Sequence, residues 1–588
     1  MTPPDLDAPD PPVHPPARRH LEDLGARRRF LGALAAWLLI ALAQPGIGRP
    51  HGFGHFAFVA LAPWAFLCCR PGPRAFLVEW GAAAIGLMLT FAWMGHLLPW
   101  LVPPMGIVPG VWVALGGVLL RRLARHHPLA LAAPAAWMAA ELLRWTLPVP
   151  LSFGWWRLGT FAHDEVWLSG SARVWGTFGL TWVFAAFGGW LADLWRLRGL
   201  APDGAPPFST PWVHVCGLTP LALAIGLTAA VPPPETTDGP RLLIVQPGIE
   251  SELKAEARDP FEELFARPVR QTVEAIAAGA REGEPPPDLV CWGETMFPLP
   301  LISDAVVQAH RDGLRRMSFV PPAGDRDLAR ARADLERLVE RELLGPSGVL
   351  PPTTAFLTGI VEWIVHGDSI RSLNAVALWG SGGRFLGTAA KRHLVPVAES
   401  IDGYARLPWV VDAVRSVGWF VPDFVPAERT GVLELPAPDG DAWRFGVAVC
   451  YDNAFDDPFR EPLRRGGGAD FHLVVSNEGW YRDGIELDYM VAFSRLHAIA
   501  SGRTVVRATN SGVSIAIDPT GATLAELVAA DGRRKGVAGT LSVVVPVPVP
   551  EARTARTPWA RTGHWQGWVW ASIVVLVAVR GYRRRTGG

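Results

Sequence analysis

Seven apolar segments follow one another through the first 231 residues, and this run constrains the fold more than any other feature of the chain. Closely spaced apolar stretches near the ~20 residues that cross a bilayer predict membrane-spanning helices. The segments are 30–44, 53–69, 76–97, 106–120, 128–145, 174–195 and 212–231, and an eighth, 565–579, stands alone near the C-terminus. We therefore expect a polytopic α-helical membrane domain of about eight spans.

Basic residues test this count, because cytoplasmic connections of membrane proteins are rich in Arg and Lys. Arginines cluster on every second connection, at 27–29, 70–74, 121–125, 196–198 and 580–585. Both termini are then cytoplasmic, and the long segment between the seventh and eighth spans lies outside. The connection 146–173, on the outer side, carries only Arg157 and Arg173.

The N-terminal part of the chain leaves one alternative open. Residues 1–26 are rich in Pro, Asp and Arg, which predicts a disordered cytoplasmic segment. The first apolar segment ends in Ala41-Leu42-Ala43, which looks like a signal-peptidase site. We prefer an uncleaved span, since Pro45 follows closely and more spans come after. Cleavage would leave the later topology unchanged.

The outer segment has the pattern of an α/β domain. A Pro-rich linker at 231–239 separates residues 27–232, the bundle, from a domain at 240–548, and 560–588 holds the eighth span and a basic tail. Short β-branched runs alternate with helical stretches, which predicts strands buried between helices. Residues 301–352 look like a charged, helical insertion. The aromatic connection 400–430 could grip a lipid chain, close as a lid, or only pack against the domain.

Composition excludes several classes of function. The formal net charge is zero, so there is no electrostatic basis for nucleic-acid binding. The five cysteines form no CxxC pair, which argues against a zinc site or a disulfide framework. The histidines are scattered, and we expect neither a metal nor a cofactor.

Three predicted strand ends carry reactive side chains. Cys450 ends the apolar run 445–449 and is followed by polar residues, which places a thiol where a nucleophile can meet substrate. Glu294 ends a second buried run and suits a general base. Lys391 offers a fixed positive charge for an oxyanion, and Glu399, eight residues on, could orient it. Taken singly, each also fits an inert core cysteine, a solvated glutamate or a surface basic cluster.

Their order and setting resemble the nitrilase superfamily, whose triad is Glu, Lys and Cys. With seven spans before the domain and one after, the chain is similar to the apolipoprotein N-acyltransferase family. Four stretches carry the resemblance: WGET at 292–295, KRHLVPVAE at 391–399, VCYD at 449–452 and VSNEGW at 475–480. The stretches at 495–503 and 507–514 and AELLR at 140–144 also match.

The resemblance implies an αββα sandwich outside the bacterial inner membrane, in the periplasm. It implies acyl transfer from a phospholipid, through a thioester on Cys450, to the amine of a lipid-modified N-terminal cysteine on an apolipoprotein. Glu294 would be the base, and Lys391 would stabilise the oxyanion and help to hold the sulfur as thiolate. Glu399 is carried over as a second carboxylate. The weaker candidates for supporting the site or lining it are Tyr451, Asp452, Trp480 and Asn374.

The chain departs from the family pattern at several positions. The family usually has Pro where Gly293 stands and Glu where Asp452 stands, and the aromatic residue ahead of the lysine is missing. A diverged paralogue with another amine acceptor, or with no activity, stays an alternative. So does a membrane-tethered amidase that passes the thioester to water.

One charged pair lies inside the bundle. Glu141 and Arg144 are three residues apart on one face of a predicted helix, in an apolar span where charge is costly. We interpret them as a structural ion pair that could also contact lipid headgroups.

Overall fold

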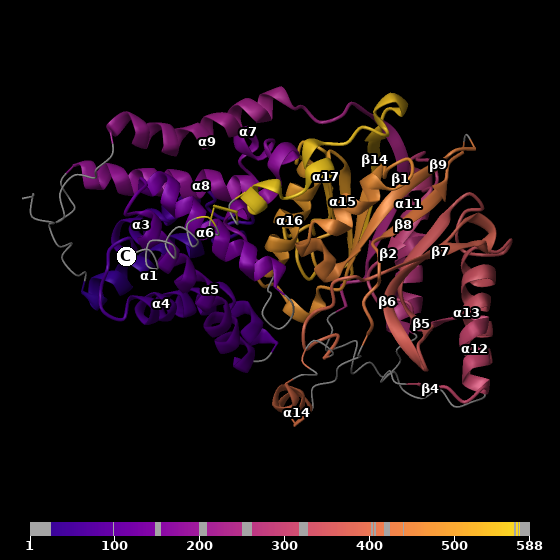
Figure 1. Ribbon diagram of the computed structural model, residues 1–588. Helices are drawn as coiled ribbons and strands as arrows, with labels where there is room; N and C mark the ends of the chain where they lie inside the picture. The colour runs from indigo at the N-terminus through magenta and orange to yellow at the C-terminus, as the bar shows by residue number, and fades with distance from the viewer. Residues whose placement is uncertain are drawn as a thin grey trace, which may run out of the picture.

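The computed structural model describes residues 25–97, 99–147, 155–198, 209–249, 262–316, 327–401, 404, 407–416, 424–438, 440–569, 572, 573 and 576. The predicted disordered segment 1–26 therefore lies outside the described residues except for Gly25 and Ala26, which begin the first helix. A helical bundle from the N-terminal part packs against a two-sheet sandwich from the C-terminal part (Figure 1).

Each of the seven apolar segments before the linker is helical. They form α1 (Ala26–Ala43), α2 (Phe56–Ala60) with α3 (Ala62–Cys68), α4 (Ala75–Thr90), α5 (Val102–Leu123), α6 (Leu129–Thr146), α8 (Ala172–Leu197) and α9 (Thr210–Ala230). Among the described residues, three helices are long and apolar enough to cross a membrane: Pro99–Leu123, Ala172–Leu197 and Thr210–Ala230. The eighth segment is helical over 565–569, and most of its remainder lies outside the described residues. Eight spans therefore stay a prediction.

The arginines at one end of the bundle are held by a buried carboxylate. Arg29 Nη1 lies 2.6 Å from Glu79 Oε1, and Arg121 pairs with the same oxygen. Arg29 also donates to the carbonyl oxygen of Arg70 at 2.7 Å. Because a buried charge is tolerated only with partners, this cluster ties α1, α4 and α5 together.

At the other end of the bundle, a short connection contacts the sandwich. It holds η3 (Leu158–Ala162) and α7 (Val166–Ser169). Arg173 donates from Nη1 to the carbonyl of Val231 at 3.1 Å and from Nη2 to that of Pro519 at 3.2 Å. A basic residue of the predicted outer connection is thus used to dock the C-terminal domain.

The C-terminal domain contains two β-sheets. The first has eight strands: β1 (Thr236–Gln246), β2 (Leu289–Trp292), β3 (Leu301–Ile302), β4 (Arg315–Arg316), β5 (Ala355–His366), β6 (Ser369–Trp379), β7 (Phe385–Ala390) and β14 (Gly539–Pro548). The second has six, in the order β13 (Thr523–Glu526), β12 (Ile515–Ile517), β11 (Thr504–Thr509), β10 (Phe471–Ser476), β9 (Ala442–Val449) and β8 (Gly431–Pro436). In each sheet, parallel strands form the centre, β1–β2–β5 and β9–β10–β11.

The sheets pack face to face, and helices cover both outer faces. Side chains from both sheets, such as Leu289 and Val447, share one buried cluster. Helix α11 (Arg267–Arg281) and the turns of η5 (Arg337–Leu343) cover the first sheet. Helices α15 (Asp457–Arg464) and α16 (Glu486–Ser501) cover the second and share their core with the bundle. The expected αββα sandwich is present, and one helical layer is wedged against the bundle (Figure 1).

The strands expected from the apolar runs are present, and five short ones were missed: β3, β4, β7, β8 and β13. β3 and β4 have two residues each and lie in the insertion that we expected to be helical. β7, β8 and β13 have mixed or partly exposed side chains, so they lack the continuous apolar signal of a buried strand. β1 begins at Thr236, inside the stretch predicted as linker, because it pairs with β14 from that residue on. The charged insertion contributes α12 (Asp304–Arg311) and α13 (Asp327–Glu336).

Candidate functional site

Glu294, Lys391 and Cys450 all lie just beyond strand ends, as predicted. Glu294 follows β2, Lys391 follows β7, and Cys450 follows β9 at the start of η8 (Cys450–Ala454). Cys450 has a φ of 50°, in the left-handed region that a residue with a Cβ rarely adopts. Such strain concentrates at functional turns. It turns the chain sharply where the thiol emerges.

Lys391 is the centre of the cluster. Its ammonium lies 3.3 Å from Glu294 Oε1 and 2.9 Å from Glu399 Oε1, and its side chain is 1% exposed. Burial alone lowers the pKa of Lys391, but the charges of Cys450, once it is ionised, and of the two carboxylates raise it well above its usual value. The lysine is therefore a permanent cation at this site.

Glu294 is held as a hydrogen-bond acceptor by groups from both sheets. Besides Lys391, its Oε1 accepts from Asn374 Nδ2 at 2.6 Å, and its Oε2 accepts from the backbone N–H of Asn477 at 2.6 Å. Asn374 Nδ2 also donates to Glu399 Oε1 at 3.0 Å. The two carboxylates thus share a lysine and an amide, which fixes the geometry of the candidate base.

Cys450 faces the same charges. Its side chain is buried, and burial together with Glu294 raises the pKa of the thiol above its ordinary value, while Lys391 lowers it. Burial and Glu294 therefore favour the neutral thiol, whereas Lys391 favours the thiolate, as we expected of it. A nucleophilic attack then requires a base to take the proton, and among the charged groups that act on the pKa of Cys450, Glu294 has the largest effect.

Asp452 and Tyr451 support the turn after the nucleophile. Asp452 accepts from the backbone N–H groups of His393 at 2.7 Å and Val449 at 3.1 Å, so it ties the lysine segment to the Cys450 turn. Burial raises its pKa to about 6, against the charge and N–H of His393, which lower it. Tyr451 stacks on Trp155 with ring centroids 5.6 Å apart. The shortened side chain at 452 thus has a positioning role.

Trp480 stands apart from this network. It is 49% exposed, and within the described residues no hydrogen bond or ring contact joins it to the other predicted site residues. Part of the aromatic connection 400–430 lies outside the described residues, including Trp419 and Phe420. Its described part holds α14 (Pro408–Ser416) and a buried Phe424.

Sequence reasoning missed a buried ion pair behind the site. Arg507 on β11 pairs with Glu478, and both side chains are fully buried. Ser476 Oγ also donates to Glu478 at 3.1 Å. The signal was present in VSNEGW and RATNSGVS, where charged residues follow strands that are otherwise apolar. The pair holds the loop whose Asn477 N–H contacts Glu294.

A second missed cluster joins the site to the bundle. Asp456, six residues after the nucleophile, accepts from Arg157 Nη1 at 3.2 Å and pairs with His564 near the C-terminus. His497 Nδ1 on α16 lies 3.7 Å from it. We call Arg157, Asp456, His497 and His564 the interdomain cluster. Arg157, Asp456 and His497 are buried, and His564 is largely so.

The Glu141–Arg144 ion pair expected inside the bundle is not formed. Glu141 instead accepts from the Leu158 N–H at 2.8 Å and from Trp137 and Thr181 at 3.0 Å each. These donors occupy the carboxylate, and Arg144 packs over the ring of Trp156, 5.1 Å from its centroid.

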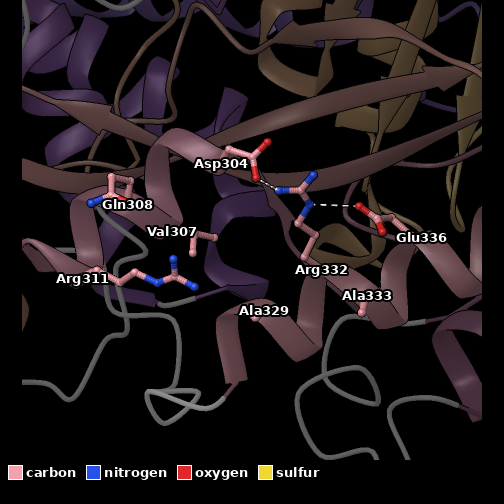
Figure 2. Close-up of a pocket in the computed structure, with 8 residues that line it drawn as sticks. All are labelled: Asp304, Val307, Gln308, Arg311, Ala329, Arg332, Ala333 and Glu336. Carbon is pink, nitrogen blue, oxygen red and sulfur yellow. Dashed lines mark hydrogen bonds and ion pairs between the residues drawn. The ribbon is translucent and has the colours of Figure 1, made fainter.

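One open cavity lies in the insertion, between α12 and α13 (Figure 2). Arg332 crosses it to pair with Asp304 and, at 2.9 Å, with Glu336. None of its lining residues belongs to the predicted site. Its ion pairs hold two surface helices together and offer no reactive group.

Known proteins match both halves of the chain. The model of the apolipoprotein N-acyltransferase N-terminal domain matches residues 35–190, and that of the carbon-nitrogen hydrolases matches 353–534. An apolipoprotein N-acyltransferase of Ralstonia nicotianae is 27% identical, over 96% of this chain and 95% of its own. One of Geobacter metallireducens is 25% identical, over 84% and 86%.

Among solved structures, an amidase from Nesterenkonia sp. aligns with 54% of this chain and 92% of its own at 16% identity. Its TM-score of 0.29 is too low to carry any inference. The N-terminal helical match, the hydrolase match and the relatives of nearly full length agree with each other. The chain belongs to the nitrilase superfamily and, within it, to the apolipoprotein N-acyltransferases.

Proposed function

We propose that this protein moves a fatty acyl group from a phospholipid to the N-terminal amine of a diacylglyceryl-cysteine on apolipoproteins, with Cys450 as the nucleophile. The observation that carries this proposal is the buried Lys391, bridging Glu294 and Glu399 beside a thiol, in a domain that shares its core with a helical bundle. The relatives' names support the reaction, and the geometry supports the roles of the residues.

In the first half-reaction, Glu294 takes the proton of the Cys450 thiol as the sulfur attacks the ester carbonyl of the phospholipid. The carbonyl oxygen gains negative charge, which the ammonium of Lys391 stabilises; one such contact is typically worth ~3–4 kcal/mol. The intermediate collapses when the C–O bond breaks. Glu294 returns the proton to the leaving lysophospholipid, and the acyl group remains on sulfur as a thioester.

In the second half-reaction, the amine of the lipid-modified cysteine attacks the thioester. Glu294 accepts a proton from the amine, an amide bond forms, and the C–S bond breaks to release Cys450 with its proton restored. No oxidant, reductant or metal takes part in this balance. Glu399 and Asn374 keep Lys391 and Glu294 aligned through both halves.

The placement in the cell follows from the arginine pattern. We assign the protein to the bacterial inner membrane as a multi-pass protein, with a bundle at 27–232, a periplasmic catalytic domain at 240–548 and an eighth span within 560–588. The alternating arginine clusters support this orientation. Donor and acceptor are both lipids, so a site docked on the bundle suits them better than it suits the soluble substrates of an amidase.

The experiment is mass spectrometry of lipoprotein N-termini from cells with and without this protein, and from cells that carry only Cys450→Ala. We expect N-acylated termini with the intact protein and free α-amines in the other two. N-termini that stay equally acylated in all three would overturn the assigned acceptor.

A further inference from the structure

Arg144 is a buried guanidinium for which the described residues provide no acceptor. It lies in the last turn of α6 and is 5% exposed. Among the described residues, no hydrogen bond or ion pair satisfies it; its one specific contact is the face of Trp156. An uncompensated buried cation is expensive, so a fold keeps one only where something else supplies the negative charge.

Glu141 does not fill that role. Its charge interacts electrostatically with Arg144. Its oxygens, however, accept hydrogen bonds from three other donors, on Trp137, Leu158 and Thr181. Because those bonds fix the carboxylate, the N–H groups of Arg144 remain without a lone pair to donate to.

Arg144 lines a narrow cavity together with Glu141, whose oxygens are already occupied by other donors. Trp112 and Trp156 line it as well, and among the described residues the buried indole N–H of Trp112 has no hydrogen-bond partner. Trp37, Trp137 and Leu87 supply apolar walls. Unpaired donors and a positive charge beside apolar walls attract an anionic group that carries a hydrocarbon chain. The cavity has a volume of about 10 Å³, room for about one water, so such a group must widen it on binding.

The cavity lies next to the nucleophile's turn. Trp145, which follows Arg144, packs on Phe455 with ring centroids 5.2 Å apart, and Trp155 stacks on Tyr451. A molecule bound at Arg144 can therefore present a neighbouring group to Cys450.

We infer that Arg144 binds the phosphodiester of the phospholipid acyl donor. This rests on the proposed function and names the part of the donor that the bundle recognises. A guanidinium donates two parallel hydrogen bonds to phosphate oxygens, and an arginine stacked on an aromatic ring is already oriented to do so. The phosphate would supply the missing acceptor, and the adjoining ester would reach the sulfur.

The test uses the full-length protein in detergent with two donors that have the same acyl chains, dipalmitoyl phosphatidylglycerol and dipalmitoylglycerol. The rate of thioester formation on Cys450 is followed by intact-protein mass spectrometry, and the ratio of kcat/KM for the two donors is compared between variants. We expect Arg144→Met to lower this ratio about 10- to 100-fold, mainly through the KM for phosphatidylglycerol, as for the loss of a charged hydrogen bond. Arg144→Lys, which keeps the charge, should lower it less.

The matched control is Arg122→Met, since Arg122 is an exposed arginine in the last turn of α5. This variant should keep the wild-type ratio. Thermal unfolding in detergent reports whether each variant is folded, and Arg144→Lys carries the test if Arg144→Met is not.

Three results separate the claims. An unchanged donor ratio in a folded Arg144 variant would overturn this inference and leave the proposed function standing. Inhibition of the dipalmitoylglycerol reaction by inorganic phosphate, lost in Arg144→Met, would also overturn it in favour of a free-anion site. Absence of a thioester from either donor in the wild-type protein would instead refute the proposed function.

Discussion

The interdomain cluster makes a prediction about how the catalytic turn is held on the bundle. Asp456 is buried and accepts from Arg157 at 3.2 and 3.4 Å, while Arg157 is itself buried and stacks over Trp145 at 4.0 Å. Removing one partner of a buried ion pair costs about 3–5 kcal/mol, because the other charge stays buried. We expect Asp456→Asn to destabilise the protein by that amount. For 588 residues that unfold as one unit, this corresponds to a fall in Tm of about 2–4 °C.

A double-mutant cycle isolates the pair. Arg157→Met should cost less than Asp456→Asn, because His564 and His497 remain beside the carboxylate. The double variant should be about 2–3 kcal/mol more stable than the sum of the two single losses predicts, since neither charge is then left unpaired. Thermal unfolding in detergent gives the stabilities. Additive losses would show that the two residues act independently and would refute the coupling.

The same pair sets a pH dependence. Burial raises the pKa of Asp456, but Arg157 and His564 lower it further, to well below its usual value. A carboxyl whose pKa is depressed by folding contributes stability that is present above its unfolded pKa and is lost as the pH falls toward its folded pKa. The difference in Tm between wild type and Asp456→Asn should therefore be full at pH 7 and shrink below about pH 4. A difference that grows in acid would contradict this assignment.

Three further predictions concern the site. Asp452 has a pKa raised to about 6, so it gains a proton and loses acceptor capacity as the pH falls through 6. The rate of thioester formation should fall over the same pH range, and Asp452→Asn should remove that inflection from the pH–rate profile. Lys391→Met leaves Glu294 and Glu399 without their shared cation, so single-turnover acylation of Cys450 should slow about 10²- to 10³-fold; an unchanged rate in a variant that still reacts with iodoacetamide would exclude the oxyanion role. A Cβ at Gly293 would lie 2.9 Å from the backbone N of Asn510, so Gly293→Ala should destabilise the protein by about 1–3 kcal/mol. The comparison, by Tm, is Gly283→Ala, where a Cβ meets open space and only the positive φ of that glycine adds strain. Equal losses of stability in the two variants would argue against the contact with Asn510.

Much of the candidate site could be predicted from the sequence, because its signals are local. Buried strands are continuous apolar runs, and a reactive residue at the end of such a run stands out, as Glu294 and Cys450 do. The relation of Lys391 to Glu399 followed from the motif. That Asn374 bridges the two carboxylates was beyond any local pattern, since it reaches them from a neighbouring strand across 80 and 25 residues.

The contacts between the two domains could not be predicted for a physical reason. Arg157 and Asp456 are 299 residues apart, and nothing in either neighbourhood indicates its partner. The prediction of a Glu141–Arg144 ion pair was wrong for a different reason. Helical spacing correctly puts both residues on one face of α6, but spacing does not reveal competitors, and the Leu158 N–H and Thr181 hydroxyl occupy the carboxylate first.

The central claim is that Cys450 carries the acyl group between two lipids. The most direct measurement is peptide mass spectrometry of the purified protein after incubation with a phospholipid of known acyl chains. The account predicts that the peptide containing Cys450 gains one acyl mass as a hydroxylamine-sensitive thioester, which a peptide with a diacylglyceryl N-terminal cysteine then removes. A Cys450→Ala protein that still transfers acyl groups to that peptide, or an acyl group found on another residue, would contradict it.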